Sequence, residues 1–105
     1  MFGTVRRYEG VDTSRTAEVT KKVEESLIPT LSKLPGFGGY YLIEAGNGIF
    51  TSISIFDTSA HADESTRVAS DWVRTEHLEN ALPNAPKITV GEIVAFNKNG
   101  VAPVS

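Results

Sequence analysis

The chain has no cysteine among its 105 residues. Such a protein forms no disulfide, and it offers no thiolate for nucleophilic catalysis or for zinc and iron–sulfur sites. The two histidines, His61 and His77, do not have the HxH or HExxH spacing of metal sites. The sequence therefore predicts neither cysteine chemistry nor a metal centre.

Long runs of one residue class are also missing. The net charge is −3 and basic residues are scattered, whereas nucleic-acid binding needs clustered Lys and Arg. No apolar stretch approaches the roughly 20 residues of a membrane span, and residues 1–10 lack the apolar run of a signal peptide. We therefore expect a cytoplasmic protein that binds neither nucleic acid nor membranes.

Composition predicts one small globular domain. Apolar residues make up 40 % of the chain and charged residues 22 %, which is ordinary globular usage. We assign the domain to residues 1–96. The remaining residues, 97–105, are expected to form a loose C-terminal tail.

The first of two amphipathic helices is expected between Asp12, a candidate cap, and the Leu34-Pro35-Gly36 stop. Its apolar stripe repeats every three or four residues. The stripe consists of Val19, Val23, Leu27, Leu31 and Leu34. We expect a kink at Pro29, because proline removes one backbone hydrogen bond.

The second helix is expected to begin at Asp57-Thr58. Its inward stripe consists of Ala62, Ser65, Val68, Ala69, Trp72 and Val73. On a continuous helix Leu78 and Leu82 would fall nearly opposite this stripe. We therefore expect a bend near Thr75, or a separate short helix over residues 76–82.

Strands are expected at residues 2–9, at 88–96 and in a hairpin over 37–56 that turns at Gly46-Asn47-Gly48. A two-residue turn would put large apolar groups on one hairpin face: Tyr40, Leu42, Glu44, Ile49, Thr51, Ile53 and Ile55. The other face would carry Gly39, Tyr41, Ile43, Phe50, Ser52, Ser54 and Phe56. Neither set suits water, so both faces should be covered.

The order β-α-β-β-α-β predicts an α+β, ferredoxin-like fold, with an antiparallel sheet and both helices on one face. The other sheet face, apolar as well, needs a partner. A symmetric homodimer with facing sheets is the simplest solution.

Two stretches carry a family resemblance: "LPGFGGYYL", which enters the hairpin, and "SISIFDTSAHA", which links it to the second helix. With the element order, they resemble the dimeric α/β-barrel superfamily, and in particular antibiotic-biosynthesis-monooxygenase-like domains of uncharacterised bacterial proteins. The resemblance covers residues 2–96. It implies a dimeric α/β barrel. The superfamily includes cofactor-free monooxygenases that oxidise polyketide-type aromatic compounds. Fold alone does not fix function.

The same superfamily also includes haem-degrading enzymes, which use an Asn on the first strand with a Trp and a His on the second helix. Strand one here offers Arg6, Arg7 and Tyr8 but no Asn, and His77 follows Trp72 too closely. Haem degradation is therefore a remote alternative, and we expect no cofactor.

The candidate catalytic residues are His77, Glu76 and Arg7. His77 would be a general base if the bend at Thr75 turned it inward, and otherwise it is a surface residue. Glu76 would lie beside Trp72 on a straight helix, where Arg6 or Arg7 could pair with it. On a bent helix it would be solvated or would cap the short helix.

The candidate pocket residues share aromatic rings or small hydroxyls that suit a small aromatic ligand. They are Trp72, Tyr8, Tyr40, Tyr41, Ser52 and Phe56. Trp72 is either plain core or a pocket wall, and Ser52 with Ser54 marks either close packing or a cavity.

Two functions follow. The first is a small-molecule pocket of a cofactor-independent monooxygenase acting on aromatic or polyketide-like compounds. The second is a non-catalytic ligand-binding or stress-related homodimer.

Overall fold

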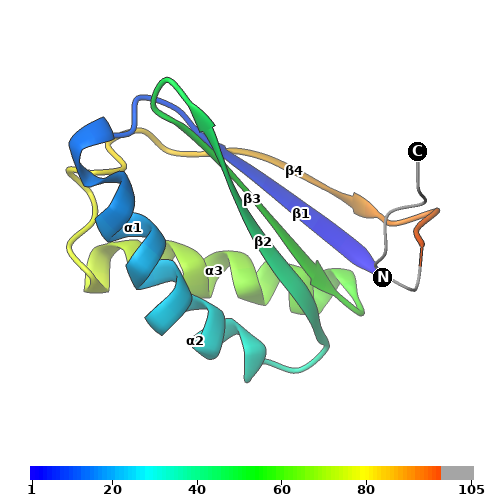
Figure 1. The fold of residues 1–105 in the computed structure, drawn as a ribbon. Helices are drawn as coiled ribbons and strands as arrows, with labels where there is room; N and C mark the ends of the chain where they lie inside the picture. Colours follow the sequence, from blue (N-terminus) through cyan, green and yellow to red (C-terminus); the bar gives the residue numbers. More distant parts are fainter. Residues whose placement is uncertain (98–105) are drawn as a thin grey trace.

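The computed structural model of the chain describes residues 1–97 and has the expected element order (Figure 1). Four strands, β1 (Phe2–Tyr8), β2 (Phe37–Gly46), β3 (Ile49–Phe56) and β4 (Lys87–Glu92), form one antiparallel sheet in the order β2-β3-β1-β4. The helices α1 (Thr16–Lys22), α2 (Ile28–Ser32) and α3 (Ser59–Thr75) lie together on one face of it. The ferredoxin-like α+β prediction is confirmed.

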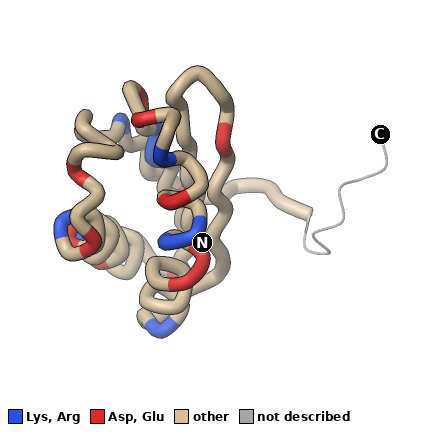
Figure 2. The backbone as a smooth tube through the Cα atoms, turned by 60° about the vertical axis from the view of Figure 1, so that its left-hand side comes forward, with Lys and Arg blue, Asp and Glu red and all other residues tan. Residues whose placement is uncertain are grey.

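The core lies between this sheet face and the helices. Both helical stripes are inside as predicted, including Val19, Val23, Leu27 and Leu31 from the first and Ala62, Ser65, Ala69 and Trp72 from α3. Charged residues of opposite sign lie near one another along the chain (Figure 2), and some of them pair, as Arg15 with Glu18 and Lys21 with Glu25 do. No helix among residues 1–97 is long and apolar enough to cross a membrane.

The first helix is interrupted before Pro29. A π-helical segment, Val23–Leu27, separates α1 from α2, and the N–H of Ile28 donates to the carbonyl of Val23. Proline has no N–H to offer the preceding turn, so the wider π turn accommodates the missing bond. The irregularity expected at Pro29 thus takes the form of a wider turn.

The predicted hairpin faces are wrong. Asn47 and Gly48 both have positive φ, as in a two-residue type I′ turn, and Gly46 pairs with Ile49. The next pair is Glu44 with Phe50, so Ala45 is an extra residue that bulges from the ladder. One inserted residue exchanges the faces of the whole preceding strand.

Because of this bulge, Tyr40 and Leu42 share the helix-covered face with Phe50, Ser52, Ser54 and Phe56. Gly39, Tyr41 and Ile43 lie on the opposite face with Ile53 and Ile55.

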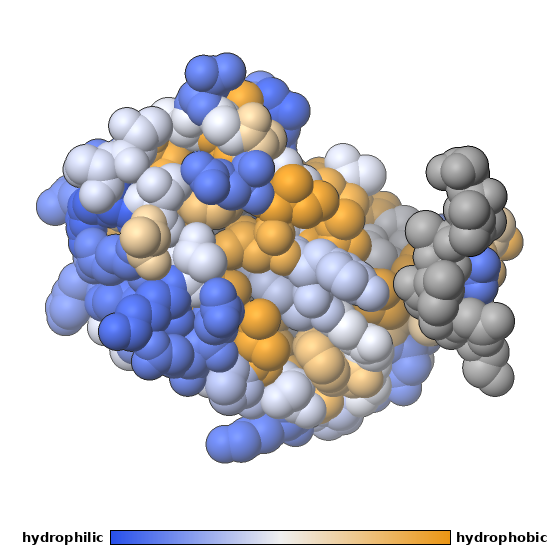
Figure 3. Space-filling view, in the orientation of Figure 1, coloured by the Kyte–Doolittle hydropathy of each residue, from blue (hydrophilic) through white to orange (hydrophobic). Residues whose placement is uncertain are grey.

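That opposite face, which we call the open face, has no helix over it. Tyr41 is 60 % exposed and Ile43 is 47 % exposed, and Val5, Ile53 and Ile55 lie beside them. Apolar side chains also gather over the strands in the space-filling view, whereas hydrophilic ones cover the α1 end (Figure 3). A monomer would leave this sheet face in water.

The last strand is shorter than predicted. β4 ends at Glu92, whereas the expected strand continued to Phe96, and Val94 and Phe96 are exposed. The tail predicted at residues 97–105 lies outside the described residues except for Asn97.

Helix α3 ends at Thr75, where the sequence predicts a change of direction. His77 has a φ of 56°, its N–H donates to the Arg74 carbonyl, and the Leu78 N–H donates to the Val73 carbonyl. This pattern is a Schellman motif. A bend therefore replaces the alternative short helix, and a single turn then buries Leu78, Ala81 and Leu82.

Replacing His77 with glycine should raise the free energy of unfolding by about 0.5–1 kcal/mol, because glycine adopts positive φ without the steric cost of a Cβ. Thermal or denaturant unfolding measures this. The matched control is Arg74→Gly, three residues earlier in regular helix, which should lose about 1 kcal/mol. Equal losses in both variants would contradict the assigned cap.

Candidate functional site

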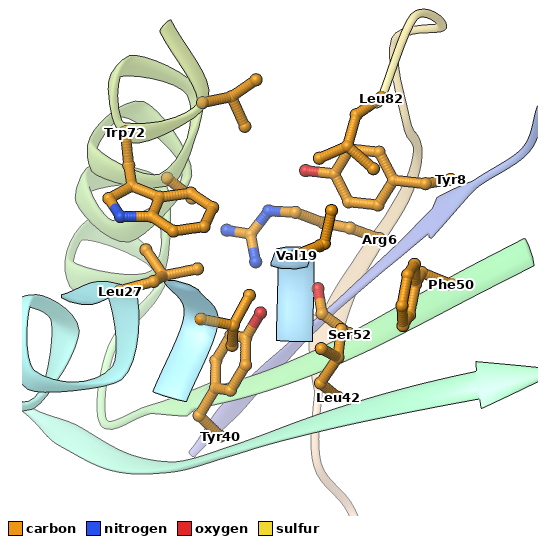
Figure 4. A pocket seen from close by; sticks show the side chains of 13 residues that line it. Arg6, Tyr8, Val19, Leu27, Tyr40, Leu42, Phe50, Ser52, Trp72 and Leu82 are labelled. Atoms are coloured by element: carbon orange, nitrogen blue, oxygen red, sulfur yellow. The ribbon is translucent and has the colours of Figure 1, made fainter. Parts of the chain in front are cut away.

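A cavity lies between the helix-covered face of the sheet and the helices (Figure 4). Its polar lining comes from Arg6, Tyr8, Tyr40 and Ser52, and Trp72 forms part of its wall. The volume open to the centre of a water molecule is about 20 Å³. This space, which we call the inner cavity, accommodates about one water-sized species.

Arg6 is the charged group of the inner cavity. It lies on β1 opposite Ser52, between the inward residues Thr4 and Tyr8, and is only 2 % exposed. Its guanidinium points from the strand toward Trp72 (Figure 4). Nη1 donates to Ser54 Oγ at 3.2 Å and Nη2 donates to Thr66 Oγ1 at 2.8 Å.

These partners leave Arg6 incompletely satisfied. Its Nε has no hydrogen-bond acceptor, and no carboxylate pairs with it within residues 1–97. Burial lowers the pKa of Arg6, and the nearby Tyr8 and Tyr40 oppose that change. Because a guanidinium stays protonated in proteins, the cavity holds an uncompensated positive charge.

Two phenols face this cation. Burial raises the pKa of Tyr8, and Arg6 opposes the change. Burial also raises the pKa of Tyr40, with the Ser52 hydroxyl acting in the opposite direction. Both hydroxyls are therefore protonated at neutral pH, and they are hydrogen-bond donors toward an anion.

Trp72 is 7 % exposed, as predicted for a residue central to the inward stripe. Its Nε1–H donates to Ser26 Oγ at 3.0 Å, which ties α3 to the π-helical segment. The bond satisfies the buried indole N–H and holds the ring as a wall of the cavity.

A larger groove adjoins the inner cavity. It runs between α3, residues 79–86 and β4, and its volume by the same measure is about 410 Å³. Arg6, Tyr8, Val73 and Leu82 border both spaces. We call this space the outer groove, and its size falls in the range of small-molecule sites.

The structure brings together four of the six predicted pocket residues, Trp72, Tyr8, Tyr40 and Ser52. Tyr41 lies on the open face because of the hairpin bulge. Phe56 is fully buried, with its ring edge-on to Phe37 at a centroid distance of 5.7 Å, and it does not line the cavity.

The three predicted catalytic residues lie elsewhere. Arg7 faces the open side of β1 and pairs with Glu9 at 2.8 Å. Glu76 pairs with Lys22 at 3.7 Å. α3 ends one residue before it, so the pairing with Arg6 or Arg7 that a straight helix would allow does not form. His77 is exposed and takes the positive-φ position that follows the C-cap residue Glu76 of α3.

Sequence reasoning did not select Arg6, Thr66 or Ser26 as site residues. Arg6 and Arg7 are adjacent on β1 and point to opposite faces, and no local sequence signal shows which of them points inward. Ser26 lies in the π-helical segment and accepts the Trp72 N–H from another helix, a contact that depends on tertiary packing.

The residues present do not fit the haem-degrading alternative. Neither His61 nor His77 lines the inner cavity or the outer groove, so neither space offers an axial histidine. His61 instead hydrogen-bonds Asp57 at 2.6 Å near the start of α3. Within residues 1–97 no group of three or more His, Asp or Glu side chains is arranged to hold a metal ion.

No protein-family model and no curated protein matches this sequence. Solved structures do match its fold. A protein of unknown function from Nitrosomonas europaea superposes with a TM-score of 0.73 at 16 % identity, over 91 % of this chain and 91 % of that one.

Two further structures carry functional names. A candidate antibiotic biosynthesis monooxygenase from Caulobacter crescentus has a TM-score of 0.66 at 18 % identity, over 90 % of both chains. A monooxygenase from Streptomyces coelicolor, solved with the ligand nanaomycin D, has a TM-score of 0.65 at 14 % identity, over 90 % of this chain and 92 % of that one. The chain therefore has the ferredoxin-like fold of these antibiotic-biosynthesis-monooxygenase-like structures.

The raised pKa values of Tyr8 and Tyr40 predict an alkaline loss of stability. Well below pH 10 both phenols are protonated in folded and unfolded chains. Above it the unfolded chain ionises first, so stability falls by up to about 1.4 kcal/mol per pH unit for each tyrosine, until pH passes the folded pKa.

Unfolding measured between pH 9 and 11 (about one unit on either side of an ordinary tyrosine pKa) tests this. Tyr8→Phe and Tyr40→Phe should each flatten the decline. The double variant Tyr8→Phe/Tyr40→Phe should show the shallowest decline. A decline as steep as in wild type in both single variants would show that the buried phenols are not its source.

Proposed function

We propose that this protein binds a small aromatic or polyketide-like compound through an oxygen atom at Arg6, and oxidises it with dioxygen without a cofactor. The observation that carries the proposal is the buried guanidinium of Arg6, which has no carboxylate partner among residues 1–97 and faces Trp72 and two protonated phenols.

The two spaces suggest how a ligand would lie. The outer groove, at about 410 Å³, has room for a ring system, whereas the inner cavity, at about 20 Å³, does not. Arg6 and Tyr8 border both spaces. A ligand whose rings occupy the groove would therefore present its oxygen to the guanidinium.

Such an arrangement suits oxidation of a phenol or enol. These compounds react with dioxygen once deprotonated, and a nearby cation stabilises the oxygen anion so formed. The Tyr8 hydroxyl, which borders both spaces, is a second donor for that anion. The low exposure of Arg6 strengthens its charge interaction, because little water screens it.

The Streptomyces coelicolor monooxygenase, with nanaomycin D bound, supports the choice of substrate class. At 14 % identity it supports a class of substrate and not a particular compound.

A second candidate is a non-catalytic ligand-binding protein. It is favoured by the ionisable side chains that line the inner cavity, Arg6, Tyr8 and Tyr40, since all are protonated and none is a general base at neutral pH. On this alternative the same compounds bind and no oxygen is consumed.

Oxygen uptake with anthrone and quinol compounds separates the two candidates. Wild-type protein should consume oxygen, and Arg6→Met should lower kcat by about 100-fold, as for removal of an oxyanion-stabilising donor. The control is Arg67→Met, which removes an equal charge from the exposed side of α3. Binding without uptake would favour the second candidate, and equal uptake by both variants would contradict a role for Arg6.

We also propose that the protein is a homodimer joined through its open faces. Tyr41, Ile43, Ile53 and Ile55 would meet their copies and leave water together. Both antiparallel sheets would then be covered on each side, as in a dimeric α/β barrel.

Sedimentation at micromolar concentration should find a dimer. Ile43→Lys puts a charge into the proposed interface and should yield monomers, because a buried, unpaired lysine is strongly unfavourable. Ala17→Lys adds the same charge on the exposed side of α1 and should remain dimeric. A stable wild-type monomer would refute the proposed assembly.

A further inference from the structure

We infer that the resting protein holds a small inorganic anion of halide size in the inner cavity, against the guanidinium of Arg6. This inference concerns the protein without substrate, and it stands whether or not the cavity catalyses a reaction.

Charge balance is the first argument. Arg6 is 98 % buried, counting from its 2 % exposure, and a buried charge without a counterion is strongly destabilising. Its hydrogen-bond partners, Ser54 and Thr66, are neutral hydroxyls. They satisfy two N–H groups but leave the net charge uncompensated, and Nε still lacks an acceptor.

Residues 1–97 offer Arg6 no internal counterion. Apart from Arg6, the polar groups lining the inner cavity are the hydroxyls of Tyr8, Tyr40 and Ser52, together with the indole N–H that Ser26 already accepts. Glu79 lines the outer groove, but it is exposed and forms no ion pair with Arg6 in the described part of the chain. No group among residues 1–97 supplies the missing negative charge, and we infer that an ion from solution supplies it.

Size defines the class of ion. About 20 Å³ admits one water-sized species, so a halide fits and an aromatic carboxylate does not. The phenol groups of Tyr8 and Tyr40 are protonated and are further donors for such an ion. The outer groove reaches Arg6 and gives the ion a path from water.

Trp72 is the only tryptophan of the chain and lines the cavity, so its fluorescence reports on the site. Iodide quenches indole on contact and serves as the probe. At constant ionic strength, set with sodium gluconate, wild-type quenching should rise steeply and saturate. Added chloride should displace iodide and restore the emission. The neutral quencher acrylamide should give a shallow, linear response that chloride leaves unchanged.

Two variants test whether the iodide response depends on Arg6. Arg6→Met should abolish the saturable iodide response, while Arg67→Met, which removes an equal charge from the outer side of α3, should keep it. If Arg6→Met does not fold, the chloride competition in wild-type protein still decides. A linear iodide response that chloride does not reduce would overturn the inference.

Thermal unfolding gives a second, independent measurement. A ligand that binds only the folded state stabilises it, so chloride at ten times its dissociation constant should raise Tm by roughly 5–10 °C in wild type. Arg6→Met should show no such shift.

Benzoate distinguishes an organic source of the negative charge from a free ion. If benzoate raised Tm while chloride, bromide and iodide did not, Arg6 would take only the anionic oxygen of an organic ligand in the outer groove. That result would also overturn the inference of a resting ion, yet leave the proposed function standing.

Discussion

The buried charge of Arg6 is the constraint on which the rest of the site depends. A guanidinium beneath a helix needs both space and acceptors, and β3 supplies them by placing Ser52 and Ser54 where larger side chains would otherwise pack. Thr66 of α3 completes the set at 2.8 Å. The alternation of isoleucine with serine along β3 thus has a physical explanation. The isoleucines lie on the open face, and the serines leave room for the arginine on the other face.

One inserted residue decides which aromatic groups surround that charge. Without the bulge at Ala45, Tyr41 and Ile43 would share a face with Ser52, and Tyr40 would lie on the open face. With it, Tyr40 joins the cavity and Tyr41 remains 60 % exposed. The character of the proposed dimer surface and the donors of the cavity therefore both follow from a single register shift.

Periodicity was enough to predict the helical stripes, the burial of Trp72 and the end of α3, because each depends on local spacing and on one layer of packing. The hairpin faces were not predictable, since a bulge changes the pairing without a distinct sequence signal. The inward arginine was missed for a related reason: Arg6 and Arg7 are adjacent, and only tertiary packing distinguishes them. The place of His77 in the motif that ends α3 could not be predicted either, because it depends on a positive φ that composition does not indicate.

The end of α3 also explains why the site consists of two unequal spaces. Had the helix continued past Thr75, residues 78–82 would have projected away from the sheet. The positive φ of His77 instead turns the chain back, so that Leu78 and Ala81 are fully buried and Leu82 borders both spaces. Leu82, with Val73 and Tyr8, thus separates a water-sized cavity from a groove large enough for rings. Arg6 reaches both, so a single cation is available to a small ion on one side and to a ligand oxygen on the other.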